Sequence, residues 1–251
     1  MKAIELSVVS PVCNGENYIA EYIEKTLSVL LKSKIAYELI LVDDGSCDNS
    51  FSVMQNFKET VIIKLASNYG QSNAIAAGLA NAKGNYVVVM DADLQDKPED
   101  ILELYQEIKH SDKSMVIAVS NDHNNSFWRD ICSRAFNYLS YALTILDHPR
   151  GSGVFRIMKR ECLQSINDAL ITPGTVLSYF QARCSWKTIQ LERGIKKTEG
   201  SSYTFAKIFR LAMSRFLPYS KIPLLRKLCR FTGSYVTHYK IAEIYWEKHE
   251  K

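Results

Sequence analysis

Residues 86–99 read Tyr-Val-Val-Val-Met-Asp-Ala-Asp-Leu-Gln-Asp-Lys-Pro-Glu. The run Tyr86–Met90 is apolar and rich in Val, which is typical of a buried strand. Asp91 and Asp93 follow at i and i+2, so both carboxylates can leave the end of the strand together. Such a pair suits Mg²⁺ or Mn²⁺, which also take phosphate oxygens and water. The alternative is an acidic loop that caps the helix expected after Pro98.

Strands and helices alternate on both sides of this stretch. The pattern predicts strands at 4–10, 37–42, 61–65, 86–90 and 115–119, and helices at 17–32, 48–57, 72–82 and 98–109. This alternation favours an α/β fold with a doubly wound, mostly parallel sheet. Ligands bind in such sheets at the carboxyl ends of the strands. After residue 120 a helical pattern at 128–146 and a turn at 149–153 precede a short strand candidate at 154–158.

Polar residues also follow the earlier strands. Asp43 and Asp44 end the second one, where a carboxylate can accept hydrogen bonds from a ribose or a base. An Asx turn is the alternative interpretation. Pro11–Glu16 ends the first strand and by itself fits an ordinary β–α turn. Asn68–Ala74 contains Gly70, which permits a tight turn before a helix whose N-terminus can face an anion.

Composition and missing motifs exclude several classes of protein. The chain has 251 residues, 47% hydrophobic and 23% charged, which suits one large globular domain. It lacks GxGxxG after the first strand and lacks GxxxxGK[ST], the signatures of dinucleotide enzymes and P-loop NTPases. No stretch approaches the roughly 18 apolar residues of a membrane-spanning helix. The N-terminal residues lead straight into the strand-like run Ile4–Val9 and show no signal-peptide pattern. The six cysteines show no CxxC pair, so we expect reduced cytoplasmic thiols and no disulfide framework.

Positive charge is concentrated in the C-terminal quarter. Residues 186–251 contain 14 Lys+Arg and 5 Asp+Glu, whereas the preceding 185 contain 17 and 22. Apolar residues at 205–216 recur at helical spacing, which predicts a basic amphipathic helix that lies on an anionic membrane surface. A solvated helix face, or packing on the body of the protein, is the alternative. Nucleic-acid binding is disfavoured because Phe205, Phe209 and Phe216 share one helical stripe and form no sheet platform for stacking bases.

Four motifs occur together in a characteristic order. They are Pro-Val-x-Asn-x-Glu at 11–16, Val-Asp-Asp-Gly-Ser at 42–46, Asn-x-Gly at 68–70 before an Ala-rich helix, and Met-Asp-Ala-Asp-Leu-Gln-Asp-x-Pro-Glu at 90–99. The combination resembles the family 2 glycosyltransferases, and most closely their dolichyl- or polyprenyl-phosphate sugar synthase branch. Weaker likenesses extend to 200–204 and 219–224. The resemblance implies a GT-A fold, a nucleotide-diphosphate sugar donor, inversion at the anomeric carbon, and Mg²⁺ or Mn²⁺.

The resemblance also implies roles for individual residues. The residues expected to bind the nucleotide sugar are Pro11, Asn14, Glu16, Asp43, Asp44, Asn68, Gly70, Asp91, Gln95 and Lys197. Asp91 and Asp93 are the expected metal ligands. The candidate catalytic residues are Asp93, Asp96 and Asp147.

Two departures from the family pattern bear on the acceptor. Many relatives carry Asp directly before Phe-Arg, where this chain has Val154. A sugar hydroxyl needs a base, for which Asp147, His148 or Asp96 are the candidates, whereas a phosphate acceptor is already ionised. The sequence also reaches Lys251 without the membrane helices of many relatives. We therefore expect a catalytic domain at 1–195 and a basic segment at 196–251, with the enzyme peripheral at the cytoplasmic leaflet of the cell membrane.

These observations leave three functions open. The first is inverting, metal-dependent transfer to a lipid-linked acceptor in the synthesis of a surface polysaccharide such as an O-antigen or capsule. The second is transfer to polyprenyl phosphate itself, which Val154 slightly favours and the absence of membrane helices slightly disfavours. The third is a catalytically inactive scaffold that binds nucleotide sugar, against which the intact Asp91 and Asp93 pair argues.

Overall fold

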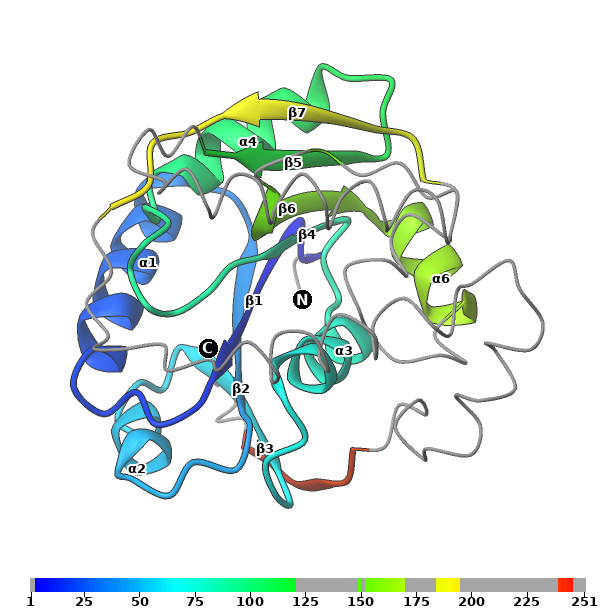
Figure 1. Cartoon of the computed structure of the whole chain (residues 1–251). Helices are drawn as coiled ribbons and strands as arrows, with labels where there is room; N and C mark the ends of the chain where they lie inside the picture. The colour runs from blue at the N-terminus through cyan, green and yellow to red at the C-terminus, as the bar shows by residue number, and fades with distance from the viewer. Residues whose placement is uncertain (1–2, 121–148, 150–151, 170–183, 195–238, 246–251) are drawn as a thin grey trace, which may run out of the picture.

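The computed structural model describes residues 3–120, 149, 152–169, 184–194 and 239–245 (Figure 1). The strands are β1 (Leu6–Val12), β2 (Tyr37–Asp43), β3 (Thr60–Leu65), β4 (Tyr86–Val89), β5 (Met115–Val119), β6 (Ser152–Lys159), β7 (Trp186–Gln190) and β8 (Ile241–Tyr245). The helices are α1 (Ile19–Ser33), α2 (Ser50–Met54), α3 (Gln71–Asn81), α4 (Asp100–Lys109) and α6 (Arg160–Ala169). Every strand and helix expected before residue 120 is present and begins within two residues of its expected start.

The described strands form one mixed sheet in the order β7-β5-β6-β4-β1-β2-β3-β8. Its centre, β4-β1-β2-β3, is parallel throughout. The strand β6 runs antiparallel between β4 and β5, and β7 continues parallel to β5. The carboxyl ends of β1, β2 and β4 therefore lie side by side, as the alternation of strands and helices predicts.

Apolar side chains hold helices on both faces of this sheet. One cluster joins the sheet to α1, α2 and α4 through residues such as Ile23, Met54 and Leu104, all of them buried. A second cluster joins the opposite face to α3 and α6, for example through Ala74 and Leu163. The same division of helices is visible in Figure 1. The doubly wound α/β fold expected from the sequence is confirmed.

Gly78 lets α3 pack closely on the sheet. A Cβ atom at Gly78 would lie 2.3 Å from Val9 Cγ1 and 3.1 Å from Val42 Cγ2. We expect Gly78→Ala to lower the free energy of unfolding by about 1–3 kcal/mol through overpacking, although Ala is the better helix former. Urea denaturation measures this, with the exposed Ala80→Gly as the control for helix propensity. An increase in stability on Gly78→Ala would contradict the close contact.

Two long-range connections were not foreseen. The prediction that the cysteines are all reduced is wrong for Cys162 and Cys184, which form a disulfide with Cα atoms 5.7 Å apart. The reason is topological: β6 and β7 flank β5, so the residue pairs at Met115 bring the start of α6 close to the residues before β7. The second connection is β8, which pairs antiparallel with β3 and lies within the segment 196–251, where the sequence analysis predicts no strand.

Several predictions lie outside the described residues. They are the helical pattern at 128–146, the candidate bases Asp147 and His148, Lys197, and the amphipathic segment at 205–216. Within the part of the chain that the structure describes, none of the helices has the length and apolar character needed to cross a bilayer.

Candidate active site

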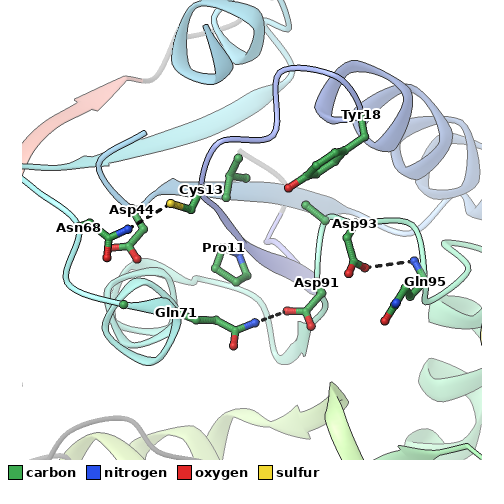
Figure 2. A pocket seen from close by; sticks show the side chains of 12 residues that line it. Pro11, Cys13, Tyr18, Asp44, Asn68, Gln71, Asp91, Asp93 and Gln95 are labelled. Carbon is green, nitrogen blue, oxygen red and sulfur yellow. Dashed lines mark hydrogen bonds between the residues drawn. The ribbon is translucent and has the colours of Figure 1, made fainter. Parts of the chain in front are cut away.

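A cavity of about 520 Å³ opens at the carboxyl ends of β1, β2 and β4. Its lining residues are Pro11, Val12, Cys13, Tyr18, Asp44, Asn68, Gly70, Gln71, Asp91, Ala92, Asp93 and Gln95. Figure 2 shows Asp44, Asn68 and Cys13 gathered at one end, with Asp91, Asp93 and Gln95 at the other. The cavity thus brings together residues from all the polar clusters found in the sequence.

The two aspartates after β4 are held by different partners. Asp91 Oδ1 accepts a hydrogen bond from Gln71 Nε2 of α3 at 2.7 Å (Figure 2). Asp93 Oδ1 accepts one from the backbone N–H of Gln95 at 3.1 Å. Burial raises the pKa of Asp91 to about 6, with the charges of Asp93 and Asp96 acting in the same direction. The charge of Arg193 and the hydrogen bond from Gln71 oppose this shift in the pKa of Asp91, and the remaining cost of ionising the crowded carboxylates together would fall further beside a bound cation.

The charge and donor set of the cavity fit a divalent metal. Among the described residues that line it, three are aspartates and none is Lys or Arg. No group of three or more His, Cys, Asp or Glu side chains close enough for metal binding occurs in the described ranges. From this chain, Asp91 and Asp93 would supply two carboxylate ligands to a metal bound at this end of the cavity. This matches Mg²⁺, which is commonly bound by one or two carboxylates together with substrate phosphates and water.

The opposite end of the cavity offers one buried carboxylate, Asp44, and the exposed polar groups of Asn68 and Cys13. Asp44 is 3% exposed, and its Oδ1 accepts from the backbone N–H of Tyr69 at 2.7 Å. Burial raises the pKa of Asp44, while the N–H groups of Tyr69 and Gly70 oppose that shift. Asn68 donates through Nδ2 to the Cys13 thiol at 3.1 Å. Polar groups of this kind can fix the orientation of a base or ribose.

Asn14 and Glu16 do not line the cavity. Asn14 Oδ1 accepts from the backbone N–H of Cys47, and Glu16 Oε2 accepts from both nitrogens of Asn49. These residues therefore join the loop after β1 to the loop after β2. They fix one loop against the other beside the cavity, and the direct contact with a nucleoside that the family resemblance implies stays a prediction.

Asp43 and Asp96 also lie away from the cavity lining. Asp43 is fully buried, and its Oδ1 accepts from the backbone N–H of Ser46 at 3.1 Å. Asp96 receives two hydrogen bonds from Arg193, at 2.7 and 3.0 Å. With both of its oxygens held by a guanidinium, Asp96 is a poor candidate for a base. Arg193 itself carried no signal in the sequence because it stands 97 residues from its partner.

Curated proteins with similar sequences are bacterial glycosyltransferases. An undecaprenyl-phosphate 4-deoxy-4-formamido-L-arabinose transferase of Proteus mirabilis is 30% identical over 245 residues, covering 94% of this chain and 73% of its own length. An uncharacterised glycosyltransferase of Bacillus subtilis is 29% identical over 239 residues, covering 92% and 72%.

Solved structures with the same fold include a sugar transferase bound to metal and nucleotide. Glucosyl-3-phosphoglycerate synthase of Mycobacterium tuberculosis, in complex with Mn²⁺, UDP and glucosyl-3-phosphoglycerate, aligns with a TM-score of 0.65 at 18% identity. The alignment covers 88% of this chain and 81% of that one. TarS of Staphylococcus aureus with UDP-GlcNAc aligns with a TM-score of 0.58 at 15% identity, covering 92% and 72%. At these identities the likeness establishes the GT-A-like fold.

The family assignment rests on the sequence. The model for glycosyl transferase family 2 matches residues 7–166, which run from the second residue of β1 through β6 and include all the cavity-lining residues. Together with the curated relatives, this match shows that the chain is a glycosyltransferase and belongs to glycosyl transferase family 2.

Proposed function

We propose that the enzyme transfers a sugar, with inversion, from a nucleoside-diphosphate donor in this cavity to the phosphate of a polyprenyl phosphate. The part of this proposal that concerns the donor rests on the charge of the cavity. Asp91, Asp93 and Asp44 face the cavity, and no Lys or Arg is among its described lining residues. A polyanionic diphosphate can enter such a site when a divalent cation accompanies it.

The two ends of the cavity suggest how the donor lies. The diphosphate belongs at Asp91 and Asp93, and the nucleoside belongs at Asp44 and Asn68. Mg²⁺ or Mn²⁺ held by Asp91 and Asp93 supplies charge neutralisation for the departing diphosphate. Gln71 orients Asp91 through its 2.7 Å hydrogen bond, so the carboxylate is directed before substrate arrives.

The assignment of the acceptor rests on the side chains near the described part of the cavity, none of which is a free base. Val154 is an apolar side chain that packs against the core cluster on the α3 face. Asp96 is paired with Arg193. The three aspartates that line the cavity, Asp44, Asp91 and Asp93, are assigned above to the donor. No other carboxylate lines the described cavity, so an acceptor that is already ionised suits it best. The curated relatives named as undecaprenyl-phosphate transferases also support a phosphate acceptor.

A hydroxyl acceptor within an O-antigen or capsule intermediate remains the second candidate, because Asp147 and His148 lie outside the described residues. Both acceptors are lipid-linked. We propose that the basic residues at 196–230 meet the anionic inner leaflet of the cell membrane and bring the enzyme to either one.

A thermal-shift panel tests the donor half. With UDP, GDP or dTDP at about 100 times its dissociation constant, mass action adds about 2.7 kcal/mol to stability. For a chain of this size that raises the melting temperature by roughly 5–10 °C. We expect this shift for one diphosphate in the presence of Mn²⁺ and little shift in EDTA. A shift that is equally large in EDTA would contradict the metal-assisted site.

The acceptor is tested with the donor identified by that panel. Incubation with polyprenyl phosphate in mixed micelles should give a sugar-phosphate lipid, detected by mass spectrometry. Transfer only to a polyprenyl-diphosphate saccharide would replace the acceptor proposed above with the second candidate.

A further inference from the structure

We propose that Arg193 is a positioning residue of the donor site: through Asp96 and the loop at 93–96 it fixes the direction of the Asp93 carboxylate. The inference rests on the proposed function in one respect, which is that the Asp93 carboxylate faces a metal and a diphosphate. The contacts that carry it belong to this chain alone. They bring together three segments that are far apart in the sequence.

The first contact is a two-point ion pair. Arg193 Nε lies 2.7 Å from Asp96 Oδ1, and Nη2 lies 3.0 Å from Oδ2. Asp96 is 3% exposed, and the Arg193 side chain is 25% exposed. A planar guanidinium bonded to both oxygens fixes the carboxylate in orientation as well as position. Removing Arg193 would leave a buried charge without its main partner, which is strongly unfavourable.

The second contact joins the backbones of the same two segments. The N–H of Gly194 donates to the carbonyl of Gln95 at 2.7 Å. Gln95 in turn donates its own N–H to Asp93 Oδ1. Leu94, between them, has φ +62°, an unfavourable value for a side chain with a Cβ atom. A turn of this shape needs external support, and the residues after β7 provide it.

The third contact is between the Arg193 guanidinium and Gly153, where any side chain would collide with it. A Cβ atom at Gly153, in β6, would lie 2.5 Å from Arg193 Nη2 and 3.0 Å from its Cζ. The guanidinium therefore rests on β6 at a position without a side chain. The guanidinium contacts Gly153 on one side and is hydrogen-bonded to Asp96 on the other. It therefore holds the loop after β4 at a fixed distance from β6.

These contacts indicate an indirect role. Arg193 does not line the cavity, and the two nitrogens that approach Asp96 are already hydrogen-bonded. Its contacts reach the cavity through Asp96, Leu94 and Gln95 to Asp93, and its positive charge also acts at a distance on Asp91 and Asp93. Outer partners that orient metal-binding carboxylates typically change metal affinity by about 10–100-fold when they are removed.

The test compares Arg193→Met with Lys187→Met. Lys187 lies on β7 and forms an ion pair with Glu107 of α4, so it is a cation on the same segment that does not touch the loop. Mn²⁺ binding is measured by calorimetry at saturating nucleoside diphosphate. We expect Arg193→Met to weaken Mn²⁺ binding by about 10–100-fold and Lys187→Met to leave it within about twofold. Arg193→Lys should restore only part of the loss, because an ammonium cannot form the same two-point pair.

A second readout needs no ligand. Hydrogen exchange at the amides of Gly194 and Gln95 should accelerate in Arg193→Met and stay unchanged in Lys187→Met. If both amides keep their protection and the Mn²⁺ affinity is unchanged, the positioning role is wrong. A lower melting temperature with unchanged Mn²⁺ affinity would likewise reduce Arg193 to a structural residue.

Failure of the proposed function gives a different pattern. In that case the unmodified protein binds no Mn²⁺ with any diphosphate, while the effect of Arg193→Met on amide exchange persists. If Arg193→Met does not fold, Gly153→Ala displaces the guanidinium without removing its charge. That variant is expected to weaken Mn²⁺ binding in the same direction, and unchanged binding in it would overturn the inference.

Discussion

Asp93→Asn is expected to reduce kcat for sugar transfer by about three orders of magnitude, with the fold intact. The amide keeps the shape of the side chain and removes the negative charge that Asp93 presents to the cavity. Charge stabilisation by a divalent cation contributes several kcal/mol to such a reaction, and each 1.36 kcal/mol corresponds to a factor of ten in rate. Steady-state kinetics with a labelled donor measures the loss.

The matched control for this variant is Asp112→Asn. Asp112 is also an aspartate in a loop, but its side chain is 84% exposed and pairs with the neighbouring Lys113. Its replacement should change neither kcat nor the melting temperature noticeably. If Asp93→Asn turned over like the unmodified enzyme, the assignment of the metal and diphosphate to Asp93 would be wrong.

Gly45→Ala should give the second large effect, a loss of both stability and donor binding. Gly45 has φ +65°, and a Cβ atom there would lie 2.4 Å from the backbone N of Asn68 and from the backbone C of Ser67. Backbone atoms cannot move aside like a flexible side chain. The loop after β2 must therefore separate from Asn68, which lines the cavity. We expect a loss of about 3 kcal/mol or more, combining a left-handed penalty of 1–2 kcal/mol with overpacking.

Gly70→Ala separates backbone strain from collision. Gly70 also has positive φ, at +88°, but a Cβ atom there meets no atom within 4 Å. Its replacement should cost about 1–3 kcal/mol of strain alone. Chemical denaturation of both variants gives the comparison. A loss at Gly45 no larger than the left-handed penalty of about 1–2 kcal/mol would show that the contact with Asn68 is not as tight as the structure indicates.

The sequence predicted the parts of the fold that depend on local periodicity. The strands and helices before residue 120 follow from runs such as Tyr86–Met90 and from the spacing of apolar residues in α1. Because parallel strands end at the same edge of a sheet, the expectation that Asp44, Asp91 and Asp93 share one cavity also followed.

Connections between distant segments could not be predicted in this way. Nothing in the neighbourhood of Arg193 or Cys184 identifies Asp96 or Cys162 as its partner, because each pair forms only through the placement of β6 and β7 beside β5. Asn14 has a short polar side chain that suits a ligand contact and a loop contact equally well. Its actual partner, the N–H of Cys47, depends on how two loops approach each other.

The pairing of β8 with β3 has a consequence for the nascent protein. Until Ile241–Tyr245 has been synthesised, β3 forms the border of the parallel sheet, and its free N–H and C=O groups can template pairing with another chain. In the folded protein β8 takes over that border. It is a short strand with an outward-facing Glu243, which are features that discourage aggregation. Folding intermediates that lack β8 therefore expose the edge of β3, which favours self-association.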